Sequence, residues 1–234
     1  MKRIALVIAI ALLVTGCAGL LAEEPIAEIR PHHYGEFDYI AYGSGSRLFY
    51  ETTLEGIERR ATNIVIGRMK DDATMVLQFS EQTGTLAIGH NFVSFEITEV
   101  IKGDLMVGEL IRIGEPYHIY DGFLYAWADY MPSVPNQEYV FILGAQATTA
   151  YVPEHIGAFP TVHSERSRFP VPGGFCREAI RRYLGEDGRF SADLQDFTSP
   201  VFGLGSRANV VTYSSIWEEV MNKYILPSLL DEDG

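Results

Sequence analysis

The chain has 234 residues, and its 31 acidic and 18 basic side chains give it a formal net charge of −13. Nucleic acid is excluded as a partner, because a protein that binds a polyanion concentrates Lys and Arg on one face, whereas the basic residues here are scattered. Hydrophobic residues make up 47% of the chain, and the 13 Tyr and 13 Phe favour a β-rich folded body over a disordered one.

The beginning of the chain has the pattern of a bacterial secretion signal. Lys2 and Arg3 precede an apolar run over residues 4–14, which ends in Val14-Thr15-Gly16-Cys17. A small residue before the cleavage point is what export processing requires, and the tetrapeptide has the form of a lipobox. This resemblance to bacterial lipoproteins implies a signal peptide over residues 1–16 and a mature chain that begins at a lipidated Cys17.

A membrane anchor that is not cleaved is the alternative. The stretch 4–17 is shorter than the roughly 20 apolar residues that a spanning helix needs, so the pattern favours the lipid. A palmitate-type anchor on Cys17 would hold the protein in the cell envelope, outside the cytoplasmic membrane or at the outer membrane if the host has one. The expected partners are the membrane, through this lipid, and an envelope protein or glycan.

The rest of the chain divides into three parts by composition. Residues 17–50 are predicted to be a tether and an aromatic linker, with no packing before about residue 30. Residues 51–165 are predicted to be an OB-like β-barrel domain, and residues 166–234 a helical C-terminal extension.

The predicted domain begins with a short helix. Thr52-Thr53-Leu54-Glu55 has the form of a capping box with Thr52 as the N-cap, so a helix is expected up to about Arg60. A run of β-branched residues over 63–69 predicts a buried strand, and another strand is expected over 75–79.

Alternation of apolar and polar residues is clearest over 92–101 and predicts a strand with one buried face. Lys102-Gly103-Asp104 turns the chain, and a strand over 110–113 should pair antiparallel with the first. Further strands are expected over 139–143 and 158–162.

Several of these segments, taken in order, carry a resemblance to a known superfamily. They are residues 63–68, 95–104, 107–111 and 136–143. The series resembles the OB-like barrel of the netrin-like and tissue-inhibitor-of-metalloproteinases superfamily, which implies a mainly β fold built as a small antiparallel barrel. In the animal inhibitors a free N-terminal cysteine chelates zinc, whereas the amine of Cys17 would be acylated here. Inhibition by that route is therefore not expected.

A long loop is expected over residues 114–137, and its aromatic side chains are the candidate ligand-binding residues. Exposed Tyr and Trp supply a large contact area with a polar tip, which suits an envelope protein or glycan. The alternative is that these rings cap the ends of the barrel. The candidates are Tyr117, Tyr120, Phe123, Tyr125, Trp127 and Tyr130.

The chain lacks the His-Glu-x-x-His, Gly-x-Ser-x-Gly and Walker motifs, so no catalytic residue, metal ligand or cofactor is assigned. A non-catalytic binding module is the favoured function. The alternatives are an envelope hydrolase or metal-dependent enzyme that uses His118, His155 or His163 with nearby carboxylates, and a protease-inhibitor-like module that acts through a loop.

The C-terminal extension is predicted to be helical. Apolar residues recur at helical spacing around Cys176, which has no cysteine partner if Cys17 is acylated, and a buried thiol is expected there. Ser215 is predicted to cap a final amphipathic helix, with Ile216, Trp217, Val220 and Tyr224 on its inner face and Pro227 at its end.

Overall fold

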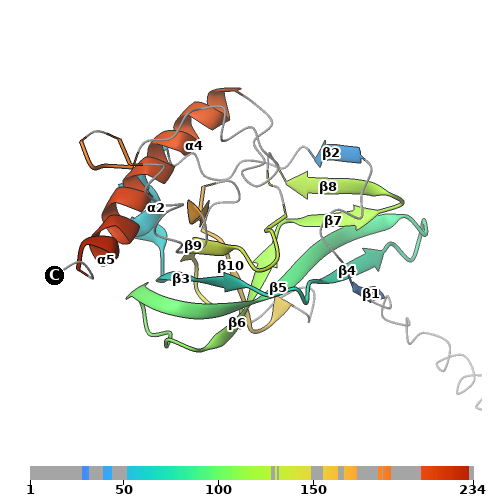
Figure 1. The fold of residues 1–234 in the computed structure, drawn as a ribbon. Helices are drawn as coiled ribbons and strands as arrows, with labels where there is room; N and C mark the ends of the chain where they lie inside the picture. The colour runs from blue at the N-terminus through green and yellow to red at the C-terminus, as the bar shows by residue number, and fades with distance from the viewer. Residues whose placement is uncertain are drawn as a thin grey trace, which may run out of the picture.

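The computed structural model describes residues 28–31, 39–43, 52–127, 130, 132–148, 155–162, 166–172, 184–185, 187–190 and 207–231. This part is mainly β, with a large eight-stranded sheet and a smaller three-stranded sheet. A C-terminal helical layer and the small sheet lie over opposite ends of the large sheet (Figure 1). The predicted mainly β class with a helical C-terminal part is confirmed, while the predicted signal, Cys17 and Cys176 lie outside the described residues.

The large sheet is built around β5 (Leu86–Lys102), which is longer than the predicted 92–101. On one edge, its first half pairs with β4 (Thr74–Phe79) and its second half with β3 (Asn63–Met69). On the other edge, its middle pairs antiparallel with β6 (Leu110–Glu115), as predicted.

The remaining strands extend the sheet outward from this centre. β9 (Glu138–Leu143) pairs with β3, and β11 (Arg168–Pro170) pairs with β9. β1 (Glu28–Pro31) pairs with β4, and β10 (Ala158–Pro160) runs parallel to β6. The strands β1, β10 and β11 are only 4, 3 and 3 residues long, and each ends in proline.

The sheet is not closed into a barrel, so the predicted closure is wrong. In the described part of the chain, β9 meets the segment after β10 at one isolated bridge, between Leu143 and Thr161. Pro160 lacks a backbone N–H, and the ladder of β10 ends there. Separate backbone hydrogen bonds, such as those from the Gly144 and Ala147 N–H groups to the Pro160 and Ala158 carbonyls, connect the two sides of the sheet there, but they do not form a continuous ladder.

The small sheet consists of β2 (Tyr39–Gly43), β8 (Phe123–Trp127) and β7 (Tyr117–Tyr120), in that order. β2 runs parallel to β8, and β7 is antiparallel to it. Two segments of the predicted tether and linker, 28–31 and 39–43, are thus paired with strands of the body. The expectation that residues 28–30 make no packing contacts is wrong.

The helices differ from the prediction at their ends. The N-cap of α2 (Leu54–Arg60) is Thr53 rather than Thr52, and its hydroxyl accepts the Gly56 N–H at 3.2 Å. α4 (Arg207–Val220) begins well before Ser215, which is therefore an interior residue rather than a cap.

Pro227 does not end the C-terminal helix. α4 continues into a π-helical turn, η4 (Met221–Ile225), and then α5 (Leu226–Asp231). Pro227 is the second residue of α5 but lies inside this continuous run of helical residues, so its missing N–H and its ring disturb the regular α-helical pattern there. The Leu226 N–H bonds to the Met221 carbonyl, five residues back, and this wider turn accommodates the proline.

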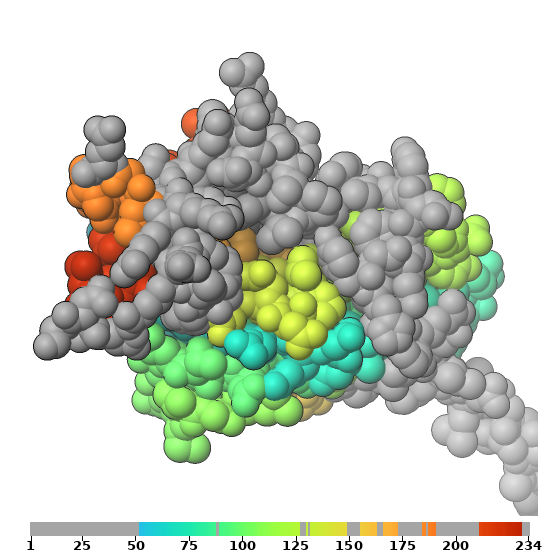
Figure 2. Space-filling model, viewed as in Figure 1, coloured from blue at the N-terminus to red at the C-terminus, as the bar shows by residue number. Residues whose placement is uncertain are grey.

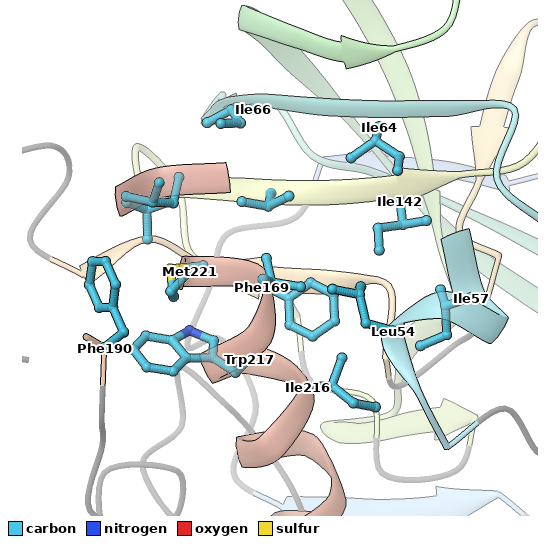
Figure 3. Packing of buried hydrophobic residues seen from close by; sticks show 14 of the residues in the cluster. Leu54, Ile57, Ile64, Ile66, Ile142, Phe169, Phe190, Ile216, Trp217 and Met221 are labelled. Atoms are coloured by element: carbon cyan, nitrogen blue, oxygen red, sulfur yellow. The ribbon is translucent and has the colours of Figure 1, made fainter. Parts of the chain in front are cut away.

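The helical layer packs on one face of the large sheet and forms its main core (Figure 3). Ile64 and Ile66 of β3 lie on this face, with Phe169 of β11. Trp217 of α4 is fully buried there, and its Nε1 donates to the Pro170 carbonyl at 3.0 Å. As predicted, Ile216, Trp217 and Val220 face inward, whereas Tyr224 is only partly buried.

A second core fills the other face of the same sheet. Val65 and Met69 of β3 and Phe141 of β9 point into it, so both strands are covered on two sides. This double burial explains their continuous apolar sequences. None of the helices in the described ranges is long and apolar enough to cross a membrane.

Replacing Trp217 with Ala is expected to lower the free energy of unfolding by roughly 3–5 kcal/mol, because it leaves a cavity and an unpaired Pro170 carbonyl. Urea denaturation measures the loss. Val211→Ala on the same helix is the control, since Val211 is 50% exposed and should change stability by less than about 0.5 kcal/mol. Equal effects of the two substitutions would contradict the burial of Trp217.

Candidate functional site

The aromatic segment after β6 is a β-hairpin rather than the long loop expected over 114–137. β7 and β8 pair in register around Asp121 and Gly122, whose φ angles are 52° and 78°. Positive φ at both positions is typical of a two-residue type I′ turn, which matches the twist of the flanking strands. The hairpin lies at one end of the molecule, and the turn between β5 and β6 lies at the other (Figure 2).

The alternation along the hairpin divides the predicted binding residues between two faces. Tyr117 is 1% exposed and Tyr130 is 2% exposed, and both belong to a core beneath the hairpin. These two rings are therefore core residues, and the closed barrel whose ends the rings were expected to cap in the alternative interpretation is not formed. Tyr120 and Tyr125 are partly buried, Phe123 is 39% exposed, and the side chain of Trp127 lies outside the described residues.

A pocket of about 360 Å³ lies where the hairpin meets the beginning of β5. His118, Tyr120 and Tyr125 supply ring systems to its wall from the hairpin. The remaining wall comes from β5. The lining residues are Leu86, Ala87, Gly89, His90, His118, Tyr120 and Tyr125.

Gly89 and Tyr125 fix the position of the His118 ring. The rings of His118 and Tyr125 are stacked, with centroids 5.1 Å apart and planes at 9°. A Cβ on Gly89 would lie 2.3 Å from Cγ of His118, so only glycine lets the imidazole lie against β5. Burial lowers the pKa of His118, and the backbone of Gly89 acts in the opposite direction. The imidazole is therefore neutral at pH 7.

His90 takes part in a second cluster of rings, on the opposite face of β5. It follows Gly89 in the strand, so its side chain points the other way. Its ring lies edge-on to His155, with centroids 4.2 Å apart, and His155 packs on Phe92. Burial, followed by the charges of His155 and His118, lowers the pKa of His90 to about 4.

Two of the three histidines considered for an enzyme, His118 and His155, are described by the structure, and they do not form a metal centre with each other. His118 and His155 lie on opposite faces of β5, and His163 lies outside the described residues. Among the residues that the structure describes, no three His, Cys, Asp or Glu side chains are placed to hold a metal ion.

A buried polar network lies next to the hairpin and was not predicted. Glu115, at the end of β6, is 2% exposed. Its carboxylate accepts hydrogen bonds from the Tyr130 hydroxyl, from the backbone N–H and hydroxyl of Ser133, and from the Asn91 amide at 3.4 Å. Nη1 of Arg168 lies 3.9 Å from the same carboxylate.

Arg168 completes this network from β11. Its Nη1 donates to the Ser133 hydroxyl at 3.1 Å, and its guanidinium lies 4.8 Å from the ring centre of Tyr130. Burial acts against the charged form, but Tyr130, Tyr139 and Glu115 outweigh it and raise the pKa of Arg168. Burial and the Glu115 charge raise the pKa of Tyr130. Arg168 therefore stays charged and Tyr130 stays neutral at pH 7, and the hydrogen bonds of the network tie the chain after β8 to the sheet.

A larger hollow of about 680 Å³ lies between α2 and α4, but its central polar groups already pair with one another. Both carboxylate oxygens of Glu58 accept from Nζ of Lys223 at 2.7 Å, and the Tyr224 hydroxyl donates to the same carboxylate. These contacts join α2 to the C-terminal helices. We regard this hollow as structural.

The residues that sequence reasoning missed differ in the signals they carry. Asp121-Gly122 is a strong hairpin signal and was available. The role of Gly89 and the pairing of Glu115 with Arg168 have no local signal, because the partners are distant in sequence and meet only in the folded sheet.

Comparisons of this chain with protein families, curated proteins and solved structures find no match. The resemblance to the netrin-like superfamily stays a prediction.

We expect stability to fall with acid through His90. An unfolded chain binds the proton near pH 6.5, whereas the folded chain binds it only near pH 4. The contribution of His90 to the free energy of unfolding is therefore fully present above pH 6.5. It is lost as the pH falls from 6.5 to 4, and the loss is roughly 2–3 kcal/mol. Urea unfolding at pH 7.5 and pH 4.5 should show a smaller acid loss in His90→Gln than in the wild type. An equal loss in both would refute the effect.

Proposed function

We propose that the protein is a lipid-tethered, extracytoplasmic lipoprotein that binds a component of the cell envelope without chemical turnover. The lipid half of the proposal rests on the charged start, the apolar run and the lipobox that ends at Cys17. One acyl chain binds membranes only weakly, so stable attachment needs more than one. The strongly acidic protein surface would repel anionic lipid headgroups, so the lipid on Cys17 is what holds the protein at the membrane.

The binding half rests on one observation, the outward face of the β7–β8 hairpin. His118, Tyr120, Phe123 and Tyr125 share this face, and His118, Tyr120 and Tyr125 line the adjacent pocket. The His118 ring also lies against Gly89, and the Tyr120 ring also packs edge-on to Phe79. Their inward neighbours Ile119 and Leu124 are anchored in the core, so the outer rings stand on a rigid support. Preorganised aromatic rings lose little entropy on binding, which favours them as contact residues.

The chemistry of the pocket favours binding over turnover. The described residues of its lining include no carboxylate, serine, cysteine or lysine. Hydrolysis of a glycosidic bond ordinarily needs a pair of carboxylates, and nucleophilic catalysis needs an activated side chain beside a base. No contact in the described part of the chain favours the hydrolase or the inhibitor alternative.

The tether is tested by labelling cells that express the full chain with radioactive palmitate. We expect label in the wild type and in Cys176→Ala, and none in Cys17→Ala, because acylation needs the lipobox cysteine. Cys176→Ala is the matched control, since the chain has 2 Cys in all. Unlabelled wild type, or label that persists in Cys17→Ala, would reject the lipid anchor.

The contact face is tested by pull-down of envelope components, both solubilised membranes and wall fragments, with the full-length protein. Tyr125→Ala should lose partners that the wild type retains, because it removes the ring stacked on His118. Leu110→Ala is the control, since Leu110 is 59% exposed and lies on β6, away from the pocket. Identical profiles for the wild type and Tyr125→Ala would argue against this face.

A further inference from the structure

The pocket beside the hairpin is electrically neutral in a strongly acidic protein. Among the residues that the structure describes, no Lys, Arg, Asp or Glu lines it, although the chain carries a net charge of −13. The imidazoles of His118 and His90, the two titratable histidines of the lining, are also uncharged at neutral pH, because burial disfavours their cations. A charged ligand would lose its hydration on entry without gaining a counter-charge, which is unfavourable.

The wall of the pocket nevertheless offers polar groups. Tyr120 and Tyr125 carry hydroxyls that donate and accept hydrogen bonds, and Nε2 of the neutral His118 imidazole is a further polar atom, whereas Nδ1 of that ring is buried. A purely hydrocarbon ligand would cover the tyrosine hydroxyls without offering them hydrogen bonds, which is unfavourable. The ring faces of the same residues suit a flat partner with C–H groups on its surface.

The size of the pocket favours a small ligand over a protein surface. About 360 Å³ lies at the lower end of the range of roughly 300–1,000 Å³ that is typical of small-molecule sites. Of the aromatic side chains on the outward face, only Phe123 is more than one-third exposed among the residues described. A protein interface needs a far larger contact area, on the order of 800 Å² per partner.

The geometry points to an uncharged, hydroxyl-bearing ring, that is, a neutral sugar residue, as the ligand of this pocket. This inference rests on the proposed function, because it names the ligand class of the same contact face. The sugar would lie against the aromatic wall and exchange hydrogen bonds with the phenol and imidazole groups, and no covalent step is involved.

Saturation-transfer NMR on the full-length protein tests the ligand class, in a detergent without a sugar headgroup. The neutral probes are chitotriose and cellotriose, and the charged probes of equal length are the glucosamine trimer and trigalacturonate. We expect saturation transfer to at least one neutral probe, and at least tenfold weaker binding of both charged probes.

Substitutions of the lining residues test whether the sugar binds in this pocket. Tyr125→Ala should weaken binding of the neutral probe at least tenfold, and Tyr125→Phe should weaken it less, because it keeps the ring and removes only the hydroxyl. Gly89→Ala should also weaken binding, because its Cβ displaces the His118 ring. Leu110→Ala is the control and should bind as the wild type does. Circular dichroism of each variant establishes that it is folded.

The outcomes separate this inference from the proposed function. Equal or tighter binding of a charged probe overturns the neutral-sugar assignment, as does neutral binding that none of the pocket variants weakens. If no sugar binds but the pull-down still depends on Tyr125, the inference fails and the proposed function stands, with a protein as the expected partner. If the pull-down is also unchanged, both fail.

Discussion

The need of one long strand to satisfy both of its edges organises the main sheet. β5 has 17 residues, and its backbone pairs with β3 and β4 on one edge and with β6 on the other. A strand of this length twists, so its two halves present their faces in different directions. The helices cover the region around β3 and β9, and the hairpin covers the beginning of β5. The candidate site and the main core therefore occupy separate parts of the molecule.

The chain passes from the large sheet to the small sheet between β6 and β7, across a single residue. Pro116 stands alone between β6 and β7 and lacks a backbone N–H, so the ladder of β6 ends there. The buried pair of Glu115 and Arg168 lies at this junction. Such a pair adds little net stability compared with an apolar replacement, but leaving one partner alone is costly. It therefore selects one position for the chain after β8, and with it the orientation of the hairpin.

The elements that could be predicted were those with a local pattern. The β-branched run at 63–69 and the alternation over 92–101 both became strands at the core of the sheet. The hairpin was not predicted, because the prediction rested on the aromatic content of the segment rather than on Asp121-Gly122, which is the turn. Ser215 has the local sequence pattern of an N-cap, but α4 begins at Arg207. Tyr213 and Ser214 are buried within this helix, so the residues before Ser215 are helical as well. Short edge strands such as β1 have no periodicity to detect, since their conformation is imposed by the neighbouring strand.

The prolines that end the outermost strands have a consequence for molecules held close together. Exposed strand edges are templates on which a second copy can add its own strand and start a fibre. Pro31 interrupts this template on β1. The edges of β10 and β11 are already occupied, because their carbonyls accept hydrogen bonds from backbone N–H groups after β9 and from Tyr213 and Trp217 of α4. Many copies on one surface could thus stand side by side as separate molecules, and resistance to polymerisation would be built into the backbone.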